Sequence, residues 1–225
     1  MEWTSTQAVR FRLTLSGLVA GPALLVASSA FIVPESSDGL RATFDAMAAQ
    51  PWLLLVQSIV EATGFAVSLA AFTAATRAVR ARGGALSTIG AVLCVVGVLG
   101  FTWSAAGGMF LSVLARMDDQ DAGFAAAMAM IGDPVTEALI STLMYAGEAG
   151  ILLVLLGMLS AHLIRIWPIL LVVAGVAADA VLPGTLSGLT ADVLLLAAAV
   201  WTALSLHRAV RTTVSTAQLV AAPAE

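Results

Sequence analysis

Six long apolar segments divide this chain and constrain its fold more than any other feature. A helix needs about 20 apolar residues to cross the hydrocarbon core of a bilayer, which is about 30 Å thick. The segments are residues 13–33, 52–76, 85–114, 136–162, 167–182 and 189–207, and the fifth is the shortest. The pattern predicts an all-α polytopic membrane helix bundle of six transmembrane helices, forming one transmembrane domain over residues 1–225.

The composition supports a membrane protein. The chain is 60% hydrophobic and only 11% charged, with a mean hydropathy of +1.00. A soluble domain has about 25% charged residues, so this chain has too little charge to cover a globule in water. The lipid bilayer is therefore the predicted partner of its apolar surface. The single cysteine, Cys94, lies within an apolar run, and we expect a small buried hydrophobic side chain there.

The first segment has some features of a signal peptide. Arg10 and Arg12 precede it, and the "ASSA" sequence resembles a cleavage site. The apolar run nevertheless continues through "FIVP" to a length that can span a bilayer. We therefore expect an uncleaved first helix.

The positions of the arginines predict the orientation. All ten basic residues are arginine. In a six-span topology eight of them lie on one side: Arg10, Arg12, Arg77, Arg80, Arg82, Arg165, Arg208 and Arg211. Only Arg41 and Arg116 lie on the other side, together with most of the loop acids. Because positive charge is retained in the cytoplasm, both termini are predicted to be cytoplasmic, in a bacterial plasma membrane.

The two longest loops contain short segments with helical propensity. These are the "GLRATFDAMAA" and "AGFAAAMAMI" stretches, which are rich in alanine and methionine. We expect each to form a short amphipathic helix on the membrane surface. Small residues at helical spacing, including Gly17, Gly21, Gly108, Gly147 and Gly150, predict close helix–helix packing.

Four acids fall inside the predicted spans: Glu61, Glu148, Asp179 and Asp192. Counting from the predicted helix starts places Glu61 and Glu148 near the midplane at similar depth, with the aspartates near the outer ends of their helices. A charge at the midplane costs at least about 2.5–3.5 kcal/mol, and no arginine or histidine lies at matching depth. We therefore expect each glutamate to face the bundle interior, either as a neutral acid or hydrated in a cavity.

Polar and aromatic residues accompany these acids in the outer half of the bundle. Tyr145 and Gln57 each lie one helical turn from a glutamate. We hypothesise a cavity that opens to the outer face, with the two glutamates as its floor and Trp103 and Tyr145 as its walls. The candidate binding residues are Glu61, Glu148, Trp103, Tyr145, Asp192, Asp179, Gln57 and Ser104; Glu61 and Glu148 are also the candidate catalytic acids.

Several chemistries are not expected. The chain has no HExxH, paired CxxC, Walker-type glycine loop or GxSxG motif. His162 and His207 lie at helix ends beside arginines, which favours interfacial roles over haem ligation. We expect no metal site and no cofactor. The net charge of −4 argues against nucleic acid as a partner.

The "GP" in the first segment and the arginine-rich "AATRAVRARGGALSTIGAVL" stretch lie in an alanine- and valine-rich chain without lysine. In these features the chain resembles uncharacterised six-span integral membrane proteins of actinobacteria. The resemblance implies a six-span fold and no particular activity.

Three functions are compatible with these observations. The first is proton-linked transport or binding of a small hydrophobic molecule. The second is an intramembrane enzyme in which a protonated carboxyl acts as general acid on a lipid-like or isoprenoid substrate, by analogy with membrane-bound terpene cyclases. The third is a structural or accessory subunit, in which each acid only donates a hydrogen bond to a nearby carbonyl. The sequence carries no signal for a particular oligomeric state.

Overall fold

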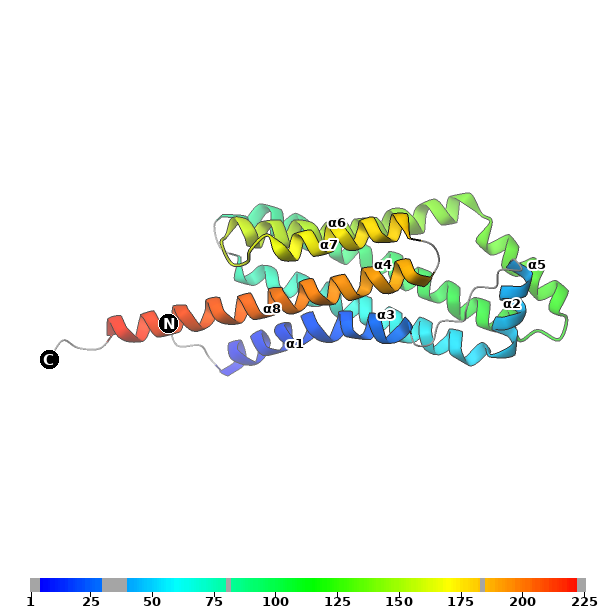
Figure 1. Cartoon of the computed structure of the whole chain (residues 1–225), viewed down its shortest axis with the longest axis horizontal. Coiled ribbons are helices and arrows are strands. Elements are labelled where there is room, and N and C mark those ends of the chain that lie inside the picture. The colour runs from blue at the N-terminus through cyan, green and yellow to red at the C-terminus, as the bar shows by residue number, and fades with distance from the viewer. Residues whose placement is uncertain (1–4, 30–39, 80–81, 183–184, 222–225) are drawn as a thin grey trace.

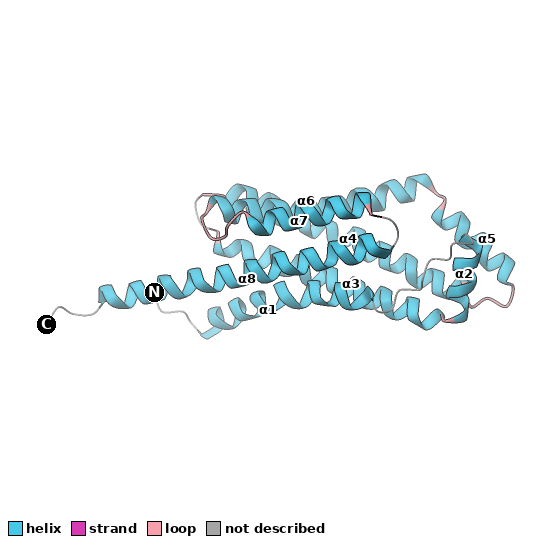
Figure 2. Ribbon diagram, in the orientation of Figure 1, coloured by secondary structure: helices cyan, strands magenta, loops and turns pink. Residues whose placement is uncertain are grey.

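The chain folds into helices throughout the part that the structure describes (Figures 1 and 2). This computed structural model describes residues 5–29, 40–79, 82–182 and 185–221, and the side chains of residues 6–29, 40–79, 82–182 and 186–210. The helices are α1 (Ser5–Ser28), α2 (Leu40–Ala49), α3 (Pro51–Ala75), η2 (Thr76–Ala78), α4 (Gly84–Leu114), α5 (Gln120–Ile131), α6 (Pro134–Ser160), α7 (Trp167–Val181) and α8 (Thr185–Ala221).

Five of these helices are long and apolar enough to cross a membrane, namely α1, α3, α4, α6 and α8. They correspond to five of the six predicted spans, and the chain is a multi-pass membrane protein by this criterion. The sixth predicted span is α7, which is apolar but has only 15 residues. The end of the first predicted span, residues 30–33, lies outside the described residues.

Local sequence signals explain where several helices begin. The Asp133 carboxylate accepts a hydrogen bond from the Thr136 backbone N–H, and Pro134 follows it at the first position of α6. Asp119 caps α5 in the same way, and Pro51 opens α3. Side-chain oxygens at the N-cap satisfy backbone N–H groups that have no partner within the helix, and proline at the first turn loses no hydrogen bond.

The five long apolar helices and the shorter α7 form a ring in the order α1, α3, α4, α6, α7 and α8. Packing is most extensive between α4 and α6 and between α1 and α3, and it is sparse between α6 and α7, where the ring closes. In Figure 1, α7, α8 and α1 lie in front of α6, α4 and α3. The first described turns of α1 and the last turns of α8 lie together at one end of the bundle, which we call the terminal end.

Glycines set the close spacing between the helices, as the small-residue pattern predicted. A Cβ atom at Gly97 of α4 would collide with the backbone of Gly147 of α6, and one at Gly21 of α1 would lie 2.9 Å from the Gly64 carbonyl oxygen of α3. Helices pack in membranes mainly through such van der Waals contact, because lipid provides no hydrophobic force between them.

The terminal half of the ring is filled by one apolar core. Its largest fully buried side chains include Phe72 of α3, Leu155 and Met158 of α6 and Leu206 of α8. Cys94 is also fully buried and free, as predicted. Between these helices the terminal half is therefore closed by packed side chains.

The opposite end of the bundle is capped by α2 and α5, and we call it the capped end. Phe44 of α2 packs edge-on against Phe124 of α5, with ring centroids 5.6 Å apart. Arg41 joins the two helices, because its guanidinium contacts Asp45 of α2 and Asp121 of α5. Both predicted loop helices therefore exist, and they pack on one another. Whether they also lie on a membrane surface stays a prediction.

Candidate functional site

All four predicted intramembrane acids lie on the core-facing side of their helices. Glu148 continues the buried stripe of Ile151 and Leu155 on α6, and Asp179 continues the stripe of Val172 and Gly175 on α7. Residues three or four positions apart share one face of a helix. Glu61 and Asp192 occupy equivalent positions on α3 and α8, in line with Ser58 and Ala199, respectively. The spacing places each acid on the core-facing stripe of its helix, and Asp179 lies where that stripe reaches the exposed end of α7.

The four carboxyls are brought into one electrostatically connected cluster. Glu148 interacts with Asp179, and Asp192 interacts with both Asp179 and Glu61. The four residues come from four different helices, α3, α6, α7 and α8. We call Glu61, Glu148, Asp179 and Asp192 the acid cluster. The interactions are mutual repulsions, so the cluster favours bound protons or cations.

The acid cluster has no counter-charge among the residues that the structure describes. Among the described residues the salt bridges are those of Arg41 at the capped end, and none of the four carboxyls makes a hydrogen bond or ion pair with another described residue. Glu61, Glu148 and Asp192 are half-buried, whereas Asp179 is exposed. Their oxygens are therefore open to water or to a ligand.

The reason for this openness is that the front helices end near the acids. Leu25, in the last turn of α1, packs against Gly64 of α3, so most of the first half of α3 extends beyond α1. α7 ends at Val181, two residues after Asp179. Figure 1 shows α3, α4 and α6 continuing past the ends of α1, α7 and α8 toward the capped end. The acid cluster thus lies near the level at which α1, α7 and α8 end and only α3, α4 and α6 continue.

An aromatic pair lies beside Glu61, on the terminal side of that residue. Phe65 of α3 stacks on Phe101 of α4, with ring centroids 3.6 Å apart and an interplanar angle of 14°. Phe65 is one helical turn from Glu61, and both rings join the apolar core. Sequence reasoning did not identify this pair, because only the packing of α3 against α4 brings the two rings together.

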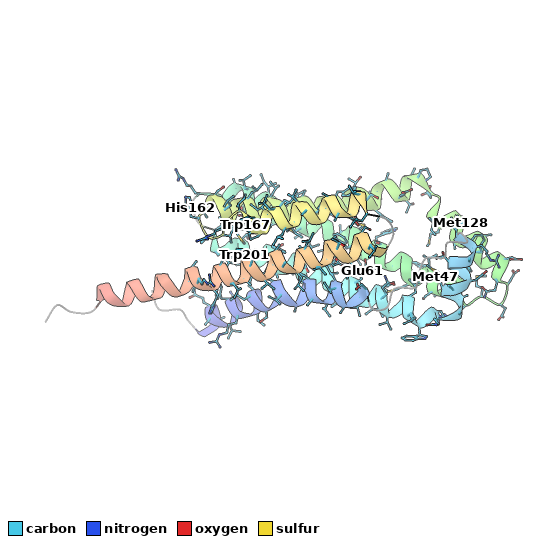
Figure 3. The ribbon with its side chains drawn as sticks, in the orientation of Figure 1. Met47, Glu61, Met128, His162, Trp167 and Trp201 are labelled. Atoms are coloured by element: carbon cyan, nitrogen blue, oxygen red, sulfur yellow. The ribbon has the colours of Figure 1, made fainter. Side chains whose placement is uncertain are left out.

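The depth of the acids can be judged from two tryptophans near the terminal end. Trp167 of α7 and Trp201 of α8 pair with ring centroids 6.4 Å apart (Figure 3), and such residues prefer the membrane–water interface. Asp192 is nine residues from Trp201 and Asp179 is twelve from Trp167, or about 13 and 18 Å along a helix. Both aspartates lie toward the ends of their own helices that are opposite the tryptophans, as predicted.

Glu61 and Glu148 are not level with one another, which corrects the expectation of similar depth. Phe65 is level with Phe101 of α4, and Gly147 is level with Gly97 of the same helix. The two glutamates are therefore offset by roughly nine residues of α4, about 13 Å. Counting from helix starts assumed that α3 and α6 begin at the same height, and they do not.

The proposed aromatic walls are not beside the acids. Trp103 is 60% exposed and Tyr145 is 64% exposed, so both side chains lie on the outside of the bundle. Tyr145 is three residues from Glu148 but projects away from the core. Gln57 and Ser104 are half-buried. Ser104 is at the level of Glu61, because α3 and α4 run antiparallel with Ser58 opposite Gly108.

The cluster does not have the geometry of a metal centre. Within the described ranges no group of three or more His, Cys, Asp or Glu residues is arranged to hold a metal ion. The arrangement is suited to exchanging protons, or to neutralising a positively charged group, at several carboxyls in turn.

No protein-family model matches the chain, and no match was found among curated proteins or solved structures.

Proposed function

We propose that the protein spans a bacterial plasma membrane six times, with α7 as the sixth span and both termini in the cytoplasm. The arrangement of the helix ends supports this orientation. The start of α1, the η2–α4 connection, the α6–α7 connection and the end of α8 share the terminal end (Figure 1), and these segments carry most of the arginines. The acid cluster then opens toward the outer face.

We further propose that the protein binds and transports a small hydrophobic molecule in exchange for protons. One observation carries this proposal: four carboxyls from four helices are linked by pairwise electrostatic interactions, and among the described residues no cation pairs with them. Ionisable groups inside a membrane are costly and commonly mark proton relays and substrate pathways. A purely structural role would be expected to pair each acid with a donor.

The chemistry of the cluster indicates how exchange would work. An unpaired carboxylate at this depth requires either a proton or a positively charged ligand group nearby. Binding of one releases the other, so proton and ligand compete for the same acids. The Phe65–Phe101 pair offers an apolar and aromatic surface beside Glu61, which suits the hydrophobic part of a ligand. The cluster therefore favours neutral or cationic hydrophobic molecules over anionic ones.

The isoprenoid enzyme is the less favoured alternative. A carbocation pathway requires aromatic walls around the acid, and the exposure of Trp103 and Tyr145 removes two of them. An accessory subunit would need each acid to be satisfied by a hydrogen bond, and none of the four is bonded to another described residue.

The proposal can be tested in proteoliposomes that contain the full chain and an internal pH dye. The probes are the lipophilic cations tetraphenylphosphonium and ethidium and the neutral molecule 1-naphthol. We expect addition of a probe outside to change the internal pH, and an imposed pH gradient to accumulate the probe. Glu61→Gln and Asp192→Asn should each reduce this exchange at least tenfold.

Glu137→Gln is the matched control, because Glu137 is an exposed acid in the first turn of α6, away from the cluster. It should leave exchange unchanged. Equal exchange by the wild type, the cluster variants and protein-free liposomes for all three probes would contradict transport. A changed lipid product in a strain carrying only Glu61→Gln, with no probe exchange, would favour the enzyme instead.

A further inference from the structure

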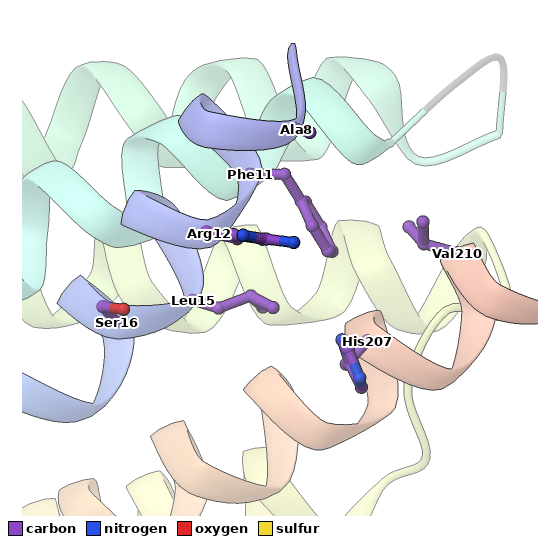
Figure 4. A pocket seen from close by; sticks show the side chains of 7 residues that line it. All are labelled: Ala8, Phe11, Arg12, Leu15, Ser16, His207 and Val210. Carbon is purple, nitrogen blue, oxygen red and sulfur yellow. The ribbon is translucent and has the colours of Figure 1, made fainter. Parts of the chain in front are cut away.

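A groove lies between α1 and α8 at the terminal end, far from the acid cluster (Figure 4). Its volume is about 440 Å³. It is lined by Ala8, Phe11, Arg12, Leu15 and Ser16 of α1 and by His207 and Val210 of α8. The sequence had assigned His207 an interfacial role, but it gave no sign that the residue shares a groove with the first helix.

The lining combines an apolar surface with two nitrogen-bearing groups. Phe11, Leu15 and Val210 supply most of the wall, and the Arg12 guanidinium and the His207 imidazole lie on facing helices (Figure 4). Neither Arg12 nor His207 makes a hydrogen bond or ion pair with another described residue. The described lining residues include no acid. Guanidinium always carries a positive charge, and imidazole has at least one N–H donor, so the groove is complementary to an anion.

The position of the groove indicates where such an anion would come from. Val9 and Leu13 of α1, on either side of Phe11, are 55% and 66% exposed. Apolar side chains this exposed on a spanning helix face lipid, so acyl chains reach the edge of the groove. The Trp167–Trp201 pair marks the headgroup level at the same end of the bundle.

We infer that this groove binds one anionic phospholipid from the leaflet that surrounds the terminal end. Arg12 and His207 hold the headgroup phosphate, and an acyl chain passes Leu15, which lies on the membrane side of Arg12. Free inorganic phosphate fits poorly, because most of the lining is apolar and would gain nothing from it. A zwitterionic headgroup is disfavoured, because none of the described lining residues is an acid that could pair with its ammonium group.

This inference is independent of the proposed transport function, since it involves none of the four acids; α8 is shared, but His207 lies at its terminal end, away from Asp192. It agrees with the proposed orientation, because the cytoplasmic leaflet carries anionic lipids and basic sites at this level attract their headgroups. A lipid held between α1 and α8 would also fix the spacing of these two helices near their ends.

The test is native mass spectrometry of the delipidated full chain in detergent, titrated with phosphatidylglycerol. Parallel titrations use phosphatidylcholine of the same acyl composition and inorganic phosphate. We expect one phosphatidylglycerol to bind at least tenfold more tightly than phosphatidylcholine. Millimolar inorganic phosphate should neither bind nor displace the lipid.

The variants separate this groove from general surface charge. Arg12→Gln should weaken phosphatidylglycerol binding at least fivefold, Arg12→Lys should restore part of it, and His207→Gln should weaken it less. Arg10→Gln is the control, because Arg10 is exposed on the same helix but does not line the groove. Thermal unfolding of each variant without lipid reports whether it is folded.

Three results would overturn the inference. They are equal losses for Arg10→Gln and Arg12→Gln, equal affinity for the two lipids, and displacement of the lipid by inorganic phosphate at similar concentration. The first would indicate a diffuse basic surface, the second a groove that recognises only acyl chains, and the third a site for free anions.

Discussion

The carboxyls of Glu61 and Asp192 interact electrostatically although α3 and α8, which carry them, scarcely touch. The interaction crosses the opening of the ring. Because two negative charges repel one another, the proton affinity of each acid depends on the charge of the other. Glu61 and Asp192 should therefore act as a coupled pair.

The first prediction concerns this coupling. Glu61→Gln and Asp192→Asn should each shift the pH midpoint of probe exchange, and the double variant should shift it by less than the sum of the two. Residues in contact through one electrostatic network give non-additive effects, whereas distant residues add. The measurement is the pH profile of uptake in proteoliposomes. Glu61→Gln combined with Glu137→Gln should be additive, and non-additivity there would show that the effect is not specific to the cluster.

The second prediction concerns the contact between α4 and α6. Gly97→Ala should lower stability by about 1–3 kcal/mol, because the added methyl group would collide with the Gly147 backbone in a packed interface. Gly107 lies on the same helix with open space around its Cα. Gly107→Ala should be neutral or stabilising by up to about 1 kcal/mol. Unfolding in detergent, followed by circular dichroism, measures both, and equal effects would mean that the α4–α6 spacing is not limiting.

The third prediction concerns the end of α6. His162 has φ = 57°, and the Leu163 N–H bonds to the Met158 carbonyl, which is the Schellman arrangement that usually has glycine at this position. The left-handed conformation costs a non-glycine residue about 1–2 kcal/mol. His162→Gly should therefore raise the unfolding temperature, and His162→Ala should not. A lower unfolding temperature for His162→Gly would mean that the imidazole makes a stabilising contact.

The fourth prediction concerns pH and the start of α6. Hydrogen bonds from the Thr136 hydroxyl and backbone N–H lower the pKa of the Asp133 carboxyl. A lowered folded-state pKa stabilises the protein above the unfolded value, which is about 3.9, and this stabilisation is lost as the pH falls through the folded value. Asp133→Ala should lower the unfolding temperature at pH 7, and the difference should shrink below pH 3. Asp133→Asn keeps an N-cap acceptor and should behave like the wild type at pH 7.

Much of the fold could be predicted from the sequence because its signals are local. Apolar runs of spanning length located the long helices, and the small-residue spacing at Gly21 and Gly147 identified contact faces. Both are properties of a single helix. The fifth predicted span, residues 167–182, corresponds to the helix α7. This helix has only 15 residues, fewer than the roughly 20 that usually cross a bilayer.

The site was only partly predictable, because it depends on which helices are neighbours. The sequence identified each of the four acids separately, as an ionisable residue that is costly to bury in an apolar segment. Nothing in the sequence showed that Asp179 would interact with Glu148. Trp103 and Tyr145 were assigned to the interior from helical spacing alone, and both are on the outside. A residue three positions from another shares a general face, but that face is wide enough to include the edge exposed to lipid.

The short α7 has a consequence for the membrane itself. Its 15 residues extend only about 22 Å, against a hydrocarbon core of about 30 Å. If α7 is the sixth span, as we propose, the bilayer that meets it thins locally to match it, at a modest cost per ångström of mismatch. Asp179 lies close to the end of this helix, so the insulating layer would then be thinnest beside the acids. In the proposed exchange a proton that leaves the cluster would therefore cross a shorter dielectric barrier at α7 than at any of the five longer helices.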